Sequence, residues 1–183
     1  MIANTKRRGL TLPEVLVTLA IVAIIAAVLV PALASQISKG DAGRVSEDLK
    51  AVQTGINTFS ADVRRYPRTI QQLANVINKT TDVDLVNGTS YTADHVSAWR
   101  GPYFVRDLQS SSDSIRTGFR GNIRTLLRNQ NLNSVPHVVV ELGGLTTSEM
   151  DAIDKLLDDG VSTTGLFRAS GTANALYFAA VVQ

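Results

Sequence analysis

One carboxylate, Glu14, lies inside a run of otherwise uncharged and mostly apolar residues that extends from Leu10 to Val30. The next charged residue after Glu14 is Lys39. A carboxylate within a membrane-spanning helix costs roughly 2.5–3.5 kcal/mol on insertion scales unless a partner compensates for its charge. Glu14 is therefore the first residue for which we predict a function, and the chemistry that it suggests is ion pairing in an apolar environment rather than catalysis.

Arginines recur at a spacing of four residues within a segment, 113–129, that is predicted to be a helix. On one helix face they would form a basic stripe of Arg116, Arg120, Arg124 and Arg128. Three interpretations stay open: a solvated face with local ion pairs, a contact with an acidic partner, and a surface for nucleic acid, which is the least favoured. An acidic partner exists in the chain, because the predicted helix 148–160 carries Glu149, Asp151, Asp154, Asp158 and Asp159.

The residue types that catalysis most often needs are scarce. The sequence has no cysteine and two histidines, His95 and His137. Neither histidine lies near a nucleophile motif such as G-x-S-x-G. We therefore predict that the protein is not an enzyme.

Two acidic turns are weak signals for a metal site. Asp82, Asp84 and Asn87 precede Gly88, but their spacing departs from the EF-hand pattern and the closing Glu is missing, which favours an ordinary polar turn. The sequence 158–160, Asp-Asp-Gly, is an equally weak signal. We assign no metal site and no cofactor, and calcium stays open as a ligand without an assigned position.

The charge distribution argues against a nucleic-acid-binding protein. The 183 residues have a formal net charge of +2, but Lys6, Arg7 and Arg8 lie before the apolar run. Without these three, 15 basic residues stand against 16 acidic ones, so the rest of the chain is close to neutral. The apolar content of 44% is enough to fill one modest core.

The apolar run is long enough to cross a membrane. Its 21 residues span about 32 Å as a helix, against about 30 Å for the hydrocarbon core of a bilayer. Basic residues precede the run and none follows closely, which predicts a cytoplasmic N-terminus and a C-terminal body outside. One simple interpretation is a secretory signal cleaved after Ala34. Two features argue against it, because the run is longer than the apolar region of such signals and because it contains the carboxylate of Glu14. The other is an uncleaved anchor, which leaves Glu14 unexplained.

The segment Lys6–Glu14, with the sequence KRRGLTLPE, resembles the type III signal of prepilins and pseudopilins. The resemblance implies that a membrane prepilin peptidase cuts between Gly9 and Leu10, methylates the new amine of Leu10 and leaves the apolar helix in place. It also implies that Glu14 of one subunit pairs with that amine on a neighbouring subunit. The sequence departs from the family at Leu10, where Phe is most common.

Two prolines fit this interpretation. Inside a helix Pro13 would clash with the carbonyl of Gly9, but cleavage before Leu10 places Pro13 in the first turn, where proline is tolerated. Pro31 lies where many pilins carry a helix-breaking proline. It frees the carbonyl of Ala27, so we expect a kinked or loosened helix at this point.

Beyond the apolar run, apolar residues continue at helical spacing on one face. They are Val45, Leu49, Val52, Ile56, Phe59 and Val63. We therefore predict that the helix continues to about Arg65, where Tyr66-Pro67 ends it. The sequence 99–103, Trp-Arg-Gly-Pro-Tyr, is similar to a loop that follows the long helix in the major pseudopilins of type II secretion.

The remaining residues predict a small head with helices and strands. We expect helices at 69–78, 113–129 and 148–160, a hairpin turn at Asn87-Gly88, a strand at 135–142, and a terminal hairpin of 166–169 with 175–182.

The predicted fold class is α+β, with a long N-terminal helix packed on a small antiparallel β-sheet as in pilins. One half of that helix is membrane-spanning and the other half is amphipathic. The predicted parts are a basic leader (1–9), a transmembrane and assembly helix (10–30), its amphipathic continuation (31–65) and a globular α+β head (66–183).

Together these features predict a structural subunit of a type IV pilus-like filament. It would be anchored in a bacterial inner membrane with its N-terminus inside and would then polymerise through its N-terminal helix. The expected partners are prepilin peptidase, identical or related pilin subunits and an inner-membrane assembly platform. The lack of a C-terminal cysteine pair and the loop at 99–103 favour a type II secretion pseudopilin or a minor pilin, while a pilus and a competence system stay open. The alternative is a soluble periplasmic binding protein released by cleavage after Ala34.

Overall fold

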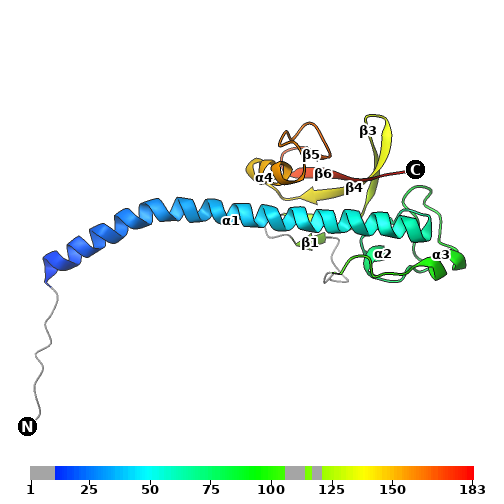
Figure 1. The fold of residues 1–183 in the computed structure, drawn as a ribbon, viewed down its shortest axis with the longest axis horizontal. Coiled ribbons are helices and arrows are strands. Elements are labelled where there is room, and N and C mark those ends of the chain that lie inside the picture. The colour runs from blue at the N-terminus through cyan, green and yellow to red at the C-terminus, as the bar shows by residue number, and fades with distance from the viewer. Residues whose placement is uncertain (1–10, 106–113, 117–120) are drawn as a thin grey trace, which may run out of the picture. The chain divides into compact units, whose positions relative to one another are not determined.

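The chain forms two compact units, an N-terminal unit (Met1–Ser38) and a C-terminal unit (Lys39–Gln183). The computed structural model describes residues 11–105, 114–116 and 121–183 (Figure 1). Its helices are α1 (Leu12–Val63), α2 (Gln71–Ala74), α3 (Ala93–Ala98) and α4 (Thr147–Leu157). Its strands are β1 (Ser114–Arg116), β2 (Asn122–Arg124), β3 (Arg128–Leu132), β4 (Val135–Gly143), β5 (Phe167–Ala169) and β6 (Asn174–Val181).

Helix α1 is the longest element, with 52 residues. It begins at Leu12, which places Pro13 in the first turn, where no intrahelical acceptor is lost. It continues through Pro31 and ends at Val63, just before Arg64 adopts a left-handed φ of 59°. The helix therefore ends two residues before the predicted position, and the X-Pro pair that follows prevents its continuation.

The strands of the C-terminal unit form one antiparallel sheet with the order β1-β2-β4-β6-β5, and β3 pairs with β4. Strand β4 is central because it pairs with β2, β3 and β6. A register shift between Val138 and Val139 marks an irregularity in the pairing of β4 with β6. The strand predicted at 135–142 and the terminal hairpin are confirmed by β4, β5 and β6.

The core of the C-terminal unit lies between helix α1 and the sheet. The six α1 residues predicted to form one apolar face are all buried, at 0–1% exposure. They belong to the same cluster as Val138, Val140 and Leu142 of β4. Polar contacts join the same layers, because the Gln53 side chain donates to the carbonyl of Ala179 at 2.7 Å. The α+β architecture, a long helix followed by an antiparallel sheet, is thereby confirmed.

The prediction of a helix over 113–129 is wrong. The described residues of this segment form β1 and β2 and lead into β3. From Ile123 to Arg128 the side chains alternate strictly, since Ile123, Thr125 and Leu127 are buried and the residues between them are exposed. Alternation with a period of two is the pattern of a strand with one covered face.

Two further boundaries differ from the prediction. Helix α4 starts at Thr147 rather than Ser148, because Thr146 and Glu149 form a capping box that satisfies the first N–H groups. The helix predicted at 69–78 is reduced to the four residues of α2. The turn at Asn87-Gly88 is confirmed, with Gly88 at a φ of 64° and an isolated antiparallel bridge between Val83 and Ser90.

Candidate assembly site

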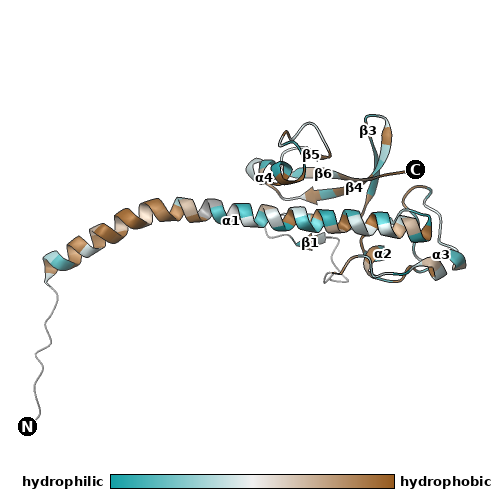
Figure 2. Ribbon diagram, in the orientation of Figure 1, coloured by the Kyte–Doolittle hydropathy of each residue, from teal (hydrophilic) through white to brown (hydrophobic). Residues whose placement is uncertain are grey.

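The stretch Leu12–Leu33 of α1 is apolar on all sides and none of it is buried (Figure 2). Its 22 residues have a mean hydropathy of 2.9, and by length and composition the stretch can cross a membrane. Thirteen of its large apolar side chains are 40–74% exposed. A continuous apolar surface of this size is not stable in water, so it requires lipid or other protein around it. We call residues Leu12–Leu33 the apolar segment.

Glu14 is the acidic residue in the first turn of α1. Its carboxylate accepts hydrogen bonds from the backbone N–H and the hydroxyl of Thr11, both at 2.8 Å. The carboxylate is thus held at the start of the helix and is exposed. The predicted cleavage residues Gly9 and Leu10 lie outside the described residues, so the predicted pairing of Glu14 with a Leu10 amine stays a prediction.

Pro31 lies inside α1 and its side chain is exposed. The helix continues on both sides of it, from Leu12 to Val63. The predicted role of Pro31 in assembly stays a prediction.

The predicted basic stripe does not form on a helix. Arg124 lies on β2 and Arg128 on β3, and both pair with Glu141 of β4, at 3.3 Å and 2.9 Å. Arg116 lies on β1, whereas Arg120 lies outside the described residues. Two of the four arginines therefore share an acidic partner within the sheet, and that partner belongs to β4 rather than to α4.

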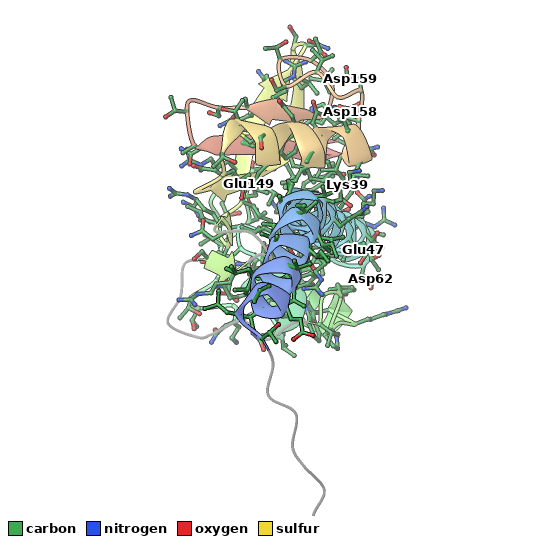
Figure 3. The ribbon with its side chains drawn as sticks, turned by 90° about the vertical axis from the view of Figure 1, so that its left-hand side faces the viewer. Lys39, Glu47, Asp62, Glu149, Asp158 and Asp159 are labelled. Carbon is green, nitrogen blue, oxygen red and sulfur yellow. The ribbon has the colours of Figure 1, made fainter. Side chains whose placement is uncertain are left out.

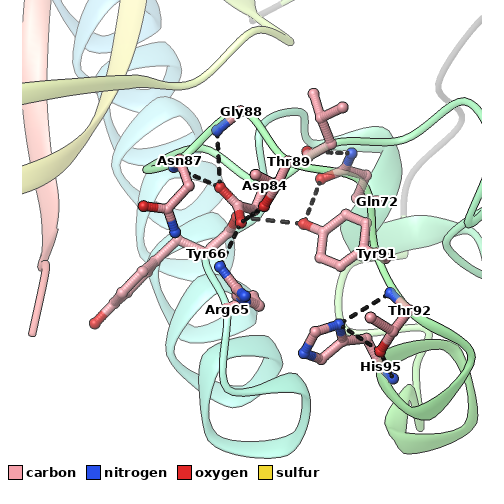
Figure 4. A network of polar contacts seen from close by, with 11 residues as sticks. Arg65, Tyr66, Gln72, Asp84, Asn87, Gly88, Thr89, Tyr91, Thr92 and His95 are labelled. Atoms are coloured by element: carbon pink, nitrogen blue, oxygen red, sulfur yellow. Dashed lines mark hydrogen bonds and ion pairs between the residues drawn. The ribbon is translucent and has the colours of Figure 1, made fainter.

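Asp84 organises the predicted polar turn after α1 (Figure 4). One carboxylate oxygen accepts from the N–H groups of Asn87 and Gly88 at 2.6 and 3.1 Å. The other accepts from Arg65 at 2.8 Å and from the Thr89 hydroxyl at 3.0 Å. Burial alone would raise the pKa of Asp84, but these hydrogen bonds and the Arg65 charge outweigh it and hold the pKa below its usual value.

The Trp-Arg-Gly-Pro-Tyr sequence at 99–103 packs against the end of α1. Trp99 donates from its indole N–H to the carbonyl of Gln72 at 3.1 Å, and the Tyr103 hydroxyl donates to Asp62 of α1 at 2.9 Å. The Tyr103 ring meets Phe59 edge to face, with centroids 5.8 Å apart. A Cβ on Gly101 would overlap the Trp99 ring, so this position requires glycine. The loop fixes the α1 terminus against the head.

The two histidines have structural contacts. His95 takes part in the capping box that starts α3, with Thr92. His137 bonds through Nδ1 to the carbonyl oxygen of Val135 at 2.8 Å, and its ring lies edge to face against Phe178.

Helix α4 ends in an acidic group. Asp154 is fully buried, and Asp158 and Asp159 follow it at the C-terminal end (Figure 3). Burial, together with the negative charges of Asp159, Asp158 and Asp151, raises the pKa of Asp154 to about 6. The sequence showed the five acidic residues, but it did not show that one of them is inside the protein.

Comparisons with known proteins agree with the leader and the apolar segment. Residues 4–30 match the family described as the prokaryotic N-terminal methylation motif. The chain is similar to the type II secretion system core protein G of Escherichia coli K12, with 31% identity over 44% of this chain and 56% of that protein. It is also similar to core protein G of Aeromonas hydrophila, with 37% identity over 42% of this chain and 54% of that protein. No solved structure gives a significant match.

The chain thus spans about half the length of the curated relatives that it matches. The match to the methylation motif covers the predicted cleavage position and extends nearly to Pro31. The resemblance to prepilins and pseudopilins, predicted from the leader, is confirmed.

Proposed function

We propose that the chain is a structural subunit of a type IV pilus-like filament, on the premise that residues 4–30 match the prokaryotic N-terminal methylation motif and that the chain is similar to type II secretion system core protein G. The observation that carries the proposal is the apolar segment, which is uncovered along its full length. A membrane and a bundle of identical helices are the two surroundings that cover such a surface. A filament subunit uses both in turn, first the membrane and then its neighbours.

The proposed maturation is cleavage between Gly9 and Leu10 by a prepilin peptidase, followed by methylation of the Leu10 amine. Cleavage here leaves the apolar segment on the mature protein. It also makes Leu10 the first residue of the mature chain, four positions before Glu14.

In the proposed assembly, Glu14 of one subunit pairs with the Leu10 amine of its neighbour. The pair forms among apolar side chains, where a low dielectric strengthens the attraction and makes an unpaired charge costly. A subunit in the wrong register would leave both charges unpaired. Glu14 therefore acts through position and register, while the apolar side chains supply most of the contact area.

The proposed location before assembly is the inner membrane, crossed once, with the leader in the cytoplasm and the C-terminal unit outside. The proposed partners are prepilin peptidase, identical or related subunits and an inner-membrane assembly platform. Similarity to core protein G favours a pseudopilin of a type II secretion system over a subunit of an extended pilus.

The mass of the intact protein extracted from membranes tests the maturation. The expected mass is that of residues 10–183 plus one methyl group. A chain that begins at Ser35 and is soluble without detergent would overturn the proposal and would support the alternative, a periplasmic protein released after Ala34.

A substitution at Glu14 tests the assembly separately. Glu14→Leu is expected to insert into the membrane and to lose the nine leader residues, yet to yield few or no filaments when the subunit is overproduced with its machinery. The matched control is Glu47→Leu, since Glu47 lies on the same helix and is exposed. Equal filament yield from both variants would exclude the role proposed for Glu14.

A further inference from the structure

A groove lies between helices α1 and α4, and we call it the α1–α4 groove. It is lined by Lys39, the first residue of the C-terminal unit, and by one face of α4. Figure 3 shows Lys39 beside α4. The groove has a volume of about 500 Å³, which lies within the range of about 300–1,000 Å³ that is usual for ligand pockets.

The lining combines an apolar surface with three charges. Its apolar part consists of Ala42, Ala152 and Leu156, and Leu156 is 49% exposed. Its charged part consists of Lys39, Asp151 and Lys155. Within the described residues, none of these three side chains forms an ion pair or a side-chain hydrogen bond. The groove therefore fits a ligand that carries both charges and an apolar portion.

The covalent chain keeps the α1–α4 groove near the membrane surface. This step rests on the proposed function, in which the apolar segment spans the membrane and the C-terminal unit lies outside. Lys39 follows Leu33, the last residue of the apolar segment, by six residues. Six residues span about 9 Å as a helix and at most about 22 Å when extended. The headgroup layer extends about 5–8 Å beyond the hydrocarbon core, and long lysine side chains reach toward it.

The charges of the groove select among phospholipid headgroups. Two lysines attract a phosphate, while Asp151 requires a cation with N–H donors. Asp158 and Asp159 follow at the C-terminal end of α4, and their charges repel a lipid with a net negative charge. A zwitterionic headgroup with a primary ammonium satisfies all three groove charges. Choline carries no N–H donor and leaves Asp151 without a hydrogen bond.

We propose that the α1–α4 groove binds a phosphatidylethanolamine molecule of the outer leaflet. Lys39 and Lys155 pair with its phosphate, Asp151 accepts from its ammonium, and the apolar lining covers the part of the lipid next to the headgroup. The lipid holds the C-terminal unit against the membrane before assembly. A subunit that enters a filament leaves this lipid behind.

The test uses the full-length chain in nanodiscs, with a fluorophore on a cysteine introduced by Ser148→Cys. Ser148 is exposed and lines the groove, and the label is unique because the sequence has no other cysteine. A small fraction of phosphatidylcholine with a spin label on its headgroup quenches a fluorophore at the membrane surface. Quenching is expected to be severalfold stronger in discs of equal parts phosphatidylethanolamine and phosphatidylcholine than in discs of phosphatidylcholine alone.

Three variants, each in the labelled chain, assign the roles of the charges. Lys39→Gln combined with Lys155→Gln should reduce quenching in the mixed discs to a level at or below that of the parent in phosphatidylcholine alone. Asp151→Asn should remove the difference between the two kinds of disc. Lys50→Gln is the control, because Lys50 is exposed on α1 outside the groove, and it should behave as the parent does. The altered side chains have no protein partner, so all variants should unfold at the parent's denaturant concentration.

The outcomes separate this inference from the proposed function. Equal quenching of the parent in both kinds of disc would overturn the assignment to phosphatidylethanolamine. A chain that enters the discs but shows no quenching would overturn the docking and leave the membrane anchor intact, whereas a chain that does not enter them would overturn both. Shielding of the label from a water-soluble quencher in filaments alone would assign the groove to a second copy of the chain instead.

Discussion

Helix α1 has two halves that are both helical and differ in what surrounds them. In the apolar segment, Leu12–Leu33, large apolar side chains point in every direction and all are exposed. In the second half, from Ala42 to Val63, apolar side chains lie on one face, and that face is fully buried against the head. The first half therefore needs surroundings that the described part of the chain does not supply, whereas the second half is covered by the head.

The difference lies in the period of the apolar residues rather than in helix propensity. A helix that is apolar all round matches lipid or a bundle of like helices, while one with an apolar stripe matches a single covering layer. In the second half the stripe meets the sheet, and the remaining face is polar (Figure 2). A substitution should thus act on the stability of the C-terminal unit in one half and on membrane insertion or assembly in the other.

The largest expected effect is that of Phe59→Ala in the second half. Phe59 is 0% exposed and contacts Tyr91 and Tyr103 edge to face. Its loss is expected to lower the free energy of unfolding of the C-terminal unit by about 3–5 kcal/mol. This free energy is measured by denaturant titration in detergent, with the fluorescence of Trp99 as the signal. Trp99 reports on the head because it is the one tryptophan of the sequence and lies in the head. Leu29→Ala in the apolar segment is the control and should change this free energy by less than about 0.5 kcal/mol.

The reverse experiment places a charge in the apolar segment. Ile24→Lys lies near its middle, where lysine costs about 2.5–3.5 kcal/mol on insertion scales. The fraction of protein that resists alkaline extraction from membranes is expected to fall severalfold, without a change in the unfolding of the extracted head. Asn57→Lys, on the exposed face of the second half, should stay in the membrane fraction. Equal extraction of both variants would contradict the assignment of the first half to the membrane.

The two halves also differ in how completely the sequence predicts them. The buried face of the second half was predicted residue by residue, because a repeat at spacings of three and four over nineteen residues fits a helix alone. The leader was predicted because Lys6–Glu14 resembles the prepilin signal and because cleavage after Gly9 would place Pro13 in the first turn of the helix. The cleavage itself stays a prediction. Neither prediction required knowledge of the sheet.

The arginine segment shows why the rest of the head was harder to predict. A spacing of four residues is about one helical turn, but it is also two full repeats of a strand, so it keeps side chains on one face in both structures. The discriminating signal was the alternation of Ile123, Thr125 and Leu127, which a helix does not produce. That Arg124 and Arg128 meet Glu141 depends on the pairing of β2 and β3 with β4, and such long-range pairing is not encoded in local spacing.

An intermediate effect is expected at Asp84, next to the end of α1. Its pKa is lower in the folded than in the unfolded state, so the stability that it contributes is present above about pH 4, the pKa of an unfolded aspartate, and is lost as pH falls through the lower pKa of the folded state. Asp84→Asn should lower the free energy of unfolding by about 2 kcal/mol at pH 7. The free energy of unfolding of this variant should also fall less steeply than that of the parent as the pH is lowered. Denaturant titrations followed by Trp99 fluorescence at pH 7 and at pH 3 measure the loss of stability and its dependence on pH. The exposed Asp94→Asn is the control, and an equal flattening there would contradict the role of Asp84.

The smallest expected effect compares two copies of one local pattern. Thr11 and Glu14 at the start of α1 form the same hydrogen bonds as Thr146 and Glu149 at the start of α4, since in each pair the Thr N–H and hydroxyl donate to the Glu carboxylate at 2.7–2.8 Å. Thr146→Ala removes a cap in the folded head and should lower the free energy of unfolding by about 1 kcal/mol. Thr11→Ala should leave that value unchanged in the same denaturant titration. A loss of stability with Thr11→Ala would show that the first half of α1 contributes to folding of the head.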